Sequence, residues 1–277
     1  MMKRLSLRRQ ATTKGDYVSD DARSTPFVLF ATQRTGSSWL MDMLDSHPAV
    51  ASYDELLLAG ASGNGYWGRT DLEFFDPYYV RHRKHDSPLA RAVWGFRYLR
   101  KLYAPRQATK AIGMKLMYDQ LWQNPCVWIY MIRHRVRVIH LVRTNLLDIV
   151  LSGQAVEARR TPHAWQGDDV ETPAITLDPA ITLATLKTLE RRIMIARRLL
   201  ELLPISHYEV SYEQLLADPS LVYELFAFLD VGAKPESVPV VSKFKKLNTA
   251  RHSDLIENDV EIARVLRGTR FERLLDG

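Results

Sequence analysis

Cysteine is nearly absent from this 277-residue sequence, which contains only Cys126. An intramolecular disulfide is therefore excluded, and nothing indicates an oxidising compartment. No apolar run approaches the roughly 18 to 20 residues that cross a bilayer. The basic N-terminus has no hydrophobic stretch of the secretory type. We accordingly expect a cytoplasmic protein with no transmembrane segment.

Metal-binding and nucleophile motifs are also missing. His82 and His85 lie among basic neighbours that oppose a cation, and no cluster of histidine, cysteine and carboxylate completes a site. The sequence has neither a G-x-S-x-G elbow nor a Cys–His arrangement. We therefore expect no bound metal.

The lysine of a Walker loop is absent from the one segment that otherwise reads as a phosphate-binding loop. Residues 27–31 predict a buried strand, and a helix begins near Gly36. Ser37 stands where the Walker lysine would be, and Arg34 lies inside the loop. A helix start offers unpaired N–H groups, to which Arg34, Ser37 and Ser38 add donors. The loop predicts an anion site without a metal, with an ordinary capped helix as the alternative.

A second short apolar run, residues 136–142, ends at Arg143. Walker-type enzymes place a magnesium-binding aspartate at such a strand end, whereas an arginine would contact an anion directly. Ser152 falls in the helix that follows. An arginine simply solvated at a strand end is the alternative reading.

Together the two segments resemble the PAPS-dependent sulfotransferases. The matching residues are Arg34, Thr35, Gly36, Ser37 and Ser38 in the first motif, and Arg143 and Ser152 in the second. Trp39, which follows the first motif, is a further candidate for cofactor binding. The spacing from Arg143 to Ser152 is one residue longer than in the cytosolic aryl and steroid enzymes. It is similar instead to the bacterial carbohydrate branch, the trehalose and nodulation-factor sulfotransferases. Residues 51–57, 112–120 and 210–219 support the same branch.

The resemblance implies transfer of a sulfuryl group from PAPS to a hydroxyl of a carbohydrate or glycolipid, leaving PAP and needing no metal. Glu55 matches the glutamate proposed as base in that branch, with Asp54 as runner-up and a surface helix cap as the plain reading. Lys115 lies in an apolar strand, where it contacts the transferring group with Arg34 or extends to the sheet edge. Tyr212 packs on the adenine or is structural.

Apolar runs alternate with helical patterns along the chain. Strands are expected at 27–31, 49–52, 111–117, 136–142 and 205–210, and helices at about 37–46, 88–103, 145–158, 180–203 and 219–229. This predicts an α/β fold, a P-loop-like parallel sheet of about five strands flanked by helices, as in the sulfotransferases. We expect a basic disordered tail at 1–24 and a single domain at 25–277.

Two irregular stretches, residues 60–79 and 160–179, are candidates for acceptor recognition. The aromatics of the first stretch would suit a sugar or would fill a satellite core. In the C-terminal basic segment, Lys246 and Arg251 are candidates for the 3′-phosphate, although the motif of the cytosolic enzymes is missing there.

The formal net charge of +6 raises a different class of function. A basic nucleic-acid-binding or scaffold protein with a degenerate fold would have such a charge, but a polyanionic cofactor accounts for it equally well. An unusual P-loop kinase is the other alternative. We expect a small-molecule or glycolipid acceptor and no specific nucleic acid. The protein could also form a homodimer.

Overall fold

A parallel sheet of five strands forms the centre of the computed structural model, which describes residues 24–64, 69, 71–159, 174–232, 242–243 and 252–276. The strands are β1 (Thr25–Ala31), β2 (Val50–Tyr53), β3 (Ala111–Met117), β4 (Arg137–Val142) and β5 (His207–Ser211). Their order across the sheet is β2-β3-β1-β4-β5, and every pairing is parallel. The predicted α/β class and the five expected strands are confirmed.

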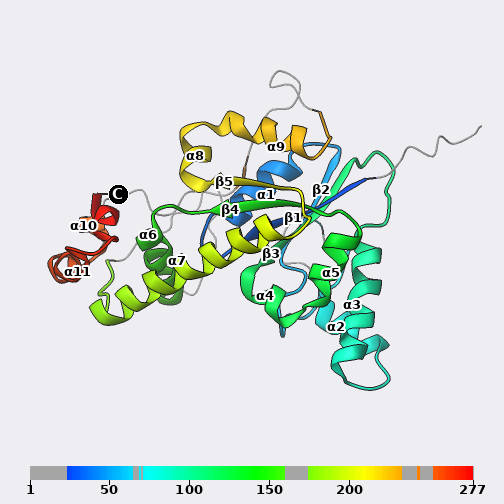
Figure 1. The fold of residues 1–277 in the computed structure, drawn as a ribbon, viewed down its shortest axis with the longest axis horizontal. Coiled ribbons are helices and arrows are strands. Elements are labelled where there is room, and N and C mark those ends of the chain that lie inside the picture. Colours follow the sequence, from blue (N-terminus) through cyan, green and yellow to red (C-terminus); the bar gives the residue numbers. More distant parts are fainter. Residues whose placement is uncertain are drawn as a thin grey trace, which may run out of the picture.

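Helices cover both faces of the sheet, as the apolar character of the strands requires. Along β1, Phe27 and Leu29 belong to one core cluster, and Val28 and Phe30 belong to the other. The first face is covered by α1 (Ser37–Asp45), α8 (Tyr212–Ala217) and α9 (Val222–Phe228). The second is covered by α3 (Pro88–Leu102), α5 (Cys126–Arg133), α6 (Leu146–Arg159) and α7 (Pro179–Leu202) (Figure 1).

The long predicted helices appear within one or two residues of their expected bounds, except that the segment at 219–229 divides into a 3-10 turn, η1 (Pro219–Leu221), and α9. The sequence analysis missed the shorter helices. These are α2 (Phe75–His82), α4 (Tyr118–Gln123), α5, α8, α10 (His252–Leu255), α11 (Asp259–Leu266) and the 3-10 helix η2 (Glu272–Asp276). A helix of eight residues or fewer spans about two turns, which gives a weak periodic signal.

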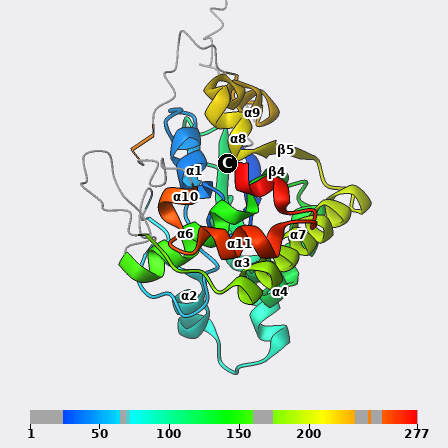
Figure 2. The same cartoon turned by 90° about the vertical axis from the view of Figure 1, so that its left-hand side faces the viewer.

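The carboxyl ends of the parallel strands meet at one edge of the sheet, which faces the viewer in Figure 2. Strand β1 lies between β3 and β4, with Ala31 opposite Met117 on one side and Leu141 on the other. The loop holding Arg34, the start of α4 and the loop holding Arg143 therefore follow three adjacent strands. Ligands of open α/β sheets bind at such an edge.

The aromatics at 74–79 belong to the protein interior. Phe74, Phe75, Tyr78 and Tyr79 are all buried, because α2 packs against α3. Of the two interpretations of this stretch, the core alternative therefore holds for these four residues. Tyr66, Trp67, Lys246 and Arg251 lie outside the described residues, as do the predicted tail up to residue 23 and residues 160–173.

Candidate active site

The loop between β1 and α1 is held in a backbone conformation that few residues adopt. Arg34 and Gly36 have φ angles of 65° and 83°. A Cβ atom on Gly36 would lie 2.5 Å from Cδ2 of Tyr212, so glycine satisfies both the left-handed backbone and the close approach of the ring. The Thr35 hydroxyl donates to the carbonyl of Thr32 at 2.9 Å. Ser37 and Ser38, at the start of α1, are buried.

The two predicted motifs are joined directly. Nε of Arg34 donates to the Ser152 hydroxyl at 3.0 Å, although these residues are 118 positions apart. Nη1 of Arg143 donates to the main-chain carbonyl of Arg34 at 3.3 Å. The arginine loop after β1, the end of β4 and the helix α6 therefore form one cationic group at the sheet edge.

Arg143 is enclosed on three sides. Its Nη2 donates to Asp148 at 2.6 Å, and its guanidinium carbon lies 4.6 Å from the centre of the Tyr212 ring. The Tyr212 ring in turn meets Trp39 edge-on at 5.6 Å. Only 8% of Arg143 is exposed, and its Nε has no hydrogen-bond partner among the described residues. An unpaired buried donor costs about 1–3 kcal/mol, so this nitrogen is available to an acceptor.

A second group of charges lies beside α1, around Lys115. Lys115 is 3% exposed, and it shares its side of β3 with Ala111 and Met117, which pack on the α1 face. Its ammonium lies 2.9 Å from Ser38 Oγ, 2.8 Å from Asp54 Oδ1 and 3.0 Å from Glu55 Oε1. The lysine does not reach out to the sheet edge. The cost of burying its charge is offset instead by the two carboxylates beside it.

Of the two candidate bases, Glu55 is the more accessible. Its side chain is 18% exposed and that of Asp54 is 5% exposed. The second oxygen of Glu55 accepts a hydrogen bond from Gln120 Nε2 at 2.9 Å. The contact of Asp54 Oδ1 with Lys115 is an ion pair without hydrogen-bond geometry. Lys115 and Gln120 thus hold the two carboxylate oxygens of Glu55, and part of the Glu55 side chain stays exposed.

Four residues of the site escaped the sequence analysis. Gln120 holds Glu55, and Asp148 holds Arg143. His252 donates to Asp148 across 104 positions, and Glu213 accepts from the backbone N–H groups of Thr144 and Asn145. The motifs at 112–120 and 210–219 offered a signal for Gln120 and Glu213. Asp148 and His252 are identifiable only from their contact across distant segments.

The pKa of Asp148 reflects these contacts. Burial alone would raise it, but hydrogen bonds from His252 and Arg143, together with the charge of Arg143, lower it below the usual value. Asp148 is therefore an ionised acceptor at neutral pH. The pKa of Tyr212 is raised by burial, although the Arg143 charge opposes the change.

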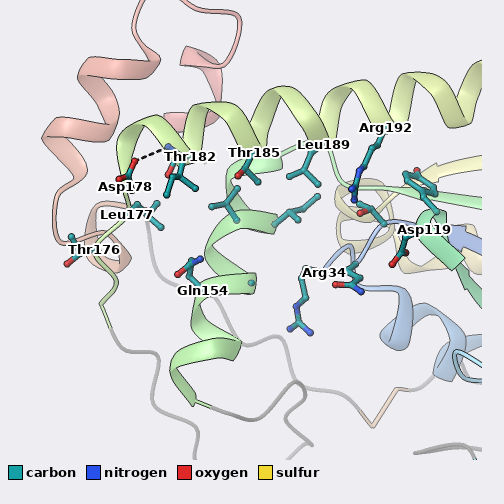
Figure 3. Close-up of a pocket in the computed structure, with 17 residues that line it drawn as sticks. Arg34, Asp119, Gln154, Thr176, Leu177, Asp178, Thr182, Thr185, Leu189 and Arg192 are labelled. Atoms are coloured by element: carbon teal, nitrogen blue, oxygen red, sulfur yellow. Dashed lines mark hydrogen bonds between the residues drawn. The ribbon is translucent and has the colours of Figure 1, made fainter. Parts of the chain in front are cut away.

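A groove of about 500 Å³ opens from Arg34 between α6 and α7. Figure 3 shows it running along α7 from Asp178 past Thr182, Thr185 and Leu189 towards Arg192. Over these residues α7 rises roughly 21 Å at about 1.5 Å per residue. Hydroxyl, amide and aliphatic side chains alternate on its walls, so it can accept a ligand with both polar and apolar parts.

The comparison of the sequence with protein families agrees with two features of this site. These are an arginine loop without the Walker lysine and an arginine at the next strand end. A model described as "Sulfotransferase family" matches residues 26–234. The chain belongs to the sulfotransferase family. Family membership supports an enzyme that transfers a sulfuryl group.

Individual relatives are distant from this member of the sulfotransferase family. Nodulation protein H of Rhizobium tropici is 25% identical over 254 residues, covering 91% of this chain and 93% of the relative. A sulfotransferase from Alicyclobacillus acidocaldarius is 12% identical with a TM-score of 0.43, covering 92% of this chain and 96% of that one. Sulfotransferase STF1 from Mycobacterium tuberculosis H37Rv is 17% identical with a TM-score of 0.41, covering 78% and 70%.

Two properties of the described residues concern metal binding and membrane insertion. No group of three or more histidine, cysteine, aspartate or glutamate residues there is placed to hold a metal ion. None of the helices in the described ranges has both the length and the apolar character for a membrane span. The expectations of metal independence and of a cytoplasmic location remain predictions.

Proposed function

We propose that this protein transfers a sulfuryl group from PAPS to a hydroxyl group of a carbohydrate or glycolipid. The observation that carries the proposal is the joined pair of arginines at adjacent strand ends. Arg143 reaches the carbonyl of Arg34 and keeps a buried Nε without a partner among the described residues. Two cationic groups so close together suit one ligand with anionic groups at both ends.

The residues present fit an adenosine bisphosphate. The first turn of α1 and the Arg34 loop offer N–H groups, hydroxyls and a permanent charge to a 5′-phosphosulfate. Arg143 and Ser152 would hold a 3′-phosphate. Gly36 and Tyr212 form a close-packed wall between the two motifs, and Trp39 extends it. The adenine contact of Tyr212 is a proposal that rests on this position.

When bound, PAPS supplies an activated sulfuryl group and a phosphate leaving group. Glu55 would accept the proton of the attacking hydroxyl, because it is a partly exposed carboxylate at the end of β2. Lys115, between Ser38 and Glu55, would stabilise negative charge on the transferring group. Arg34 would do the same at the opposite wall. Asp54 keeps the ammonium of Lys115 in place.

We assign the acceptor to the groove between α6 and α7. It begins at Thr32, Gln33 and Arg34, next to the site of transfer. Two arginines, Arg34 and Arg192, and two aspartates, Asp119 and Asp178, line the groove. The charges of its lining therefore balance. Such a lining favours an uncharged, hydroxyl-rich acceptor with an apolar part.

Ligand binding tests the cofactor assignment. PAP should bind in calorimetry and raise the melting temperature, whereas ATP with magnesium should do neither. Arg34→Ala and Arg143→Ala should each weaken PAP binding about 10- to 100-fold, because each removes about 1.5–3 kcal/mol of charge-assisted hydrogen bonding. Arg133→Ala, at an exposed arginine of α5, is the control and should bind PAP normally.

Two results would overturn the proposal. Preferential stabilisation by ATP with magnesium would favour a kinase, and salt-sensitive nucleic-acid binding without any PAP effect would favour a binding protein. If PAP binds as expected, incubation with labelled PAPS and a lipid and glycan extract, followed by mass spectrometry of the labelled product, would identify the acceptor.

A further inference from the structure

Asp148 connects Arg143 to a residue from the far end of the chain. Its Oδ2 accepts from Arg143 Nη2 at 2.6 Å, and its Oδ1 accepts from His252 Nε2 at 2.7 Å. His252 begins α10 and is 6% exposed. One carboxylate therefore holds a guanidinium and an imidazole side by side, in the part of the site where Arg143 is available to a phosphate.

Arg143 and His252 each have a buried nitrogen that does not bond to Asp148. Within the described part of the chain, neither Arg143 Nε nor His252 Nδ1 has a hydrogen-bond partner. Buried polar atoms in folded proteins nearly always find one. Two such atoms on side chains that share a carboxylate indicate a common missing ligand, rather than two separate packing faults.

The hydrogen bonds also fix which nitrogen of His252 carries the proton. Asp148 is an ionised acceptor, so Nε2 must be the donor and Nδ1 of the neutral ring is a bare lone pair. A lone pair repels a phosphate oxygen. Once Nδ1 gains a proton, the imidazolium donates to the phosphate through Nδ1 and to Asp148 through Nε2.

We propose that His252 binds the 3′-phosphate of PAPS and PAP together with Arg143, and takes up one proton as the phosphate arrives. This rests on the proposed function, because the ligand is the same adenosine bisphosphate. The proton adds to Nδ1 from solvent, and no covalent bond to the phosphate changes. The 3′-phosphate would then be bound by a permanent cation and by one that depends on pH.

The charged and titratable groups around the imidazole carry both signs. Asp148 on α6 touches it, and Asp254 lies on its own helix α10. Arg143 at the end of β4 opposes a second positive charge, but it shares the Asp148 carboxylate, and Tyr212 of α8 lies beneath its guanidinium. A dianionic phosphate would bring two negative charges to the two cations.

Calorimetric titration with PAP, between pH 7 and 8.5 in buffers of different ionisation enthalpy, tests the proposal. Above pH 7 the phosphate groups are already largely dianionic, so proton uptake reports on the protein. The wild type should take up close to one proton more than His252→Gln, and its Kd for PAP should rise up to tenfold between pH 7 and 8. His252→Gln keeps an amide donor to Asp148 but cannot titrate, and its Kd should change little with pH.

Controls separate a ligand contact from a structural role. AMP, which lacks the 3′-phosphate, should bind both proteins with the same proton uptake. His207→Gln, at an exposed histidine where β5 begins, should behave as wild type with PAP. If His252→Gln does not fold, NMR of the wild-type histidine rings replaces it: PAP should move the titration midpoint of His252 to higher pH, and AMP should leave it in place.

The outcomes for the two proposals are distinguishable. No PAP binding by the wild type would overturn the proposed function. PAP binding with equal proton uptake in wild type and His252→Gln, or an unmoved His252 resonance, would overturn this inference alone.

Discussion

Glu55 and Lys115 illustrate at the scale of single residues how a buried charge is kept ready for chemistry. The ammonium of Lys115 contacts Glu55, Asp54 and Ser38 within 3.0 Å. Unpaired, this lysine would be costly at 3% exposure. Paired in this way, it is held by three side chains beside the proposed site of transfer. The same contacts hold Glu55 in position.

Glu55→Gln should lower kcat about 10²- to 10⁴-fold, the usual contribution of a general base. The amide cannot accept the proton of the acceptor hydroxyl. The Kd for PAP should stay within about twofold of wild type, because Glu55 contacts none of the arginines proposed to bind the cofactor. Rapid-quench kinetics with labelled PAPS and calorimetry with PAP measure the two quantities.

Asp54→Asn is the matched control for that experiment. Asp54 is the more buried of the two carboxylates, so its loss should reduce stability more than turnover. A kcat that falls with Asp54→Asn and not with Glu55→Gln would transfer the role of base to Asp54.

At the scale of elements, a chain of hydrogen bonds ties α4, β4, β5 and α7 together. The Tyr118 hydroxyl contacts His140 Nε2 at 2.6 Å, and His140 Nδ1 contacts Glu209 at 2.9 Å. Glu209 also accepts hydrogen bonds from Arg197. His140 is fully buried, so this chain satisfies a polar ring inside the sheet and fixes α7 against β5.

Glu209 should make stability depend on pH. Burial would raise its pKa, but hydrogen bonds from His140 and Arg197 lower it to about 2. A carboxyl group whose pKa is lower in the folded state stabilises that state above its unfolded pKa, and the stabilisation is lost as pH falls. The melting temperature of wild type should therefore exceed that of Glu209→Gln most at pH 6, and the gap should narrow between about pH 4.5 and 2.

Glu201→Gln serves as the control, because Glu201 forms an exposed ion pair with Arg198, and such pairs contribute little. A gap between wild type and Glu209→Gln that stays constant from pH 6 to 2 would contradict the assignment.

At the scale of the whole molecule, the proposed cofactor and acceptor sites meet at a single residue, Arg34. Arg143 and Tyr212 lie on the cofactor side of it, and the groove between α6 and α7 leads away from it (Figure 3). Because α7 lines the groove and supplies none of the proposed cofactor contacts, changes on α7 should affect the acceptor without affecting PAP.

Thr185→Trp should fill the groove from α7. With the acceptor found by labelling, we expect KM to rise at least about tenfold, since the indole occupies volume that the acceptor needs, while the Kd for PAP stays unchanged. Lys187→Trp puts the same side chain at an exposed position of α7 outside the groove and should leave KM unaltered. Equal effects of the two variants on KM, or a matching loss of PAP affinity in Thr185→Trp, would contradict the assignment of the groove to the acceptor.

The sequence by itself determined the alternation of strands and helices and the chemical character of the two loops. An apolar run such as residues 111–117 is a local pattern of the sequence. The presence of Ser37 in place of the Walker lysine can likewise be recognised without knowing where the loop lies in the fold. A parallel α/β sheet brings the carboxyl ends of its strands together, so two arginines that each follow a strand come to lie at one edge.

Only the tertiary structure decided which groups meet. The strand order puts β1 between β3 and β4, and no local pattern encodes that order. Asp148 meets His252 across 104 positions, and Lys115 contacts Ser38 on α1 and two carboxylates in the loop after β2. Contacts of this kind depend on the packing of distant segments, whereas hydrophobic periodicity records only whether each segment is buried.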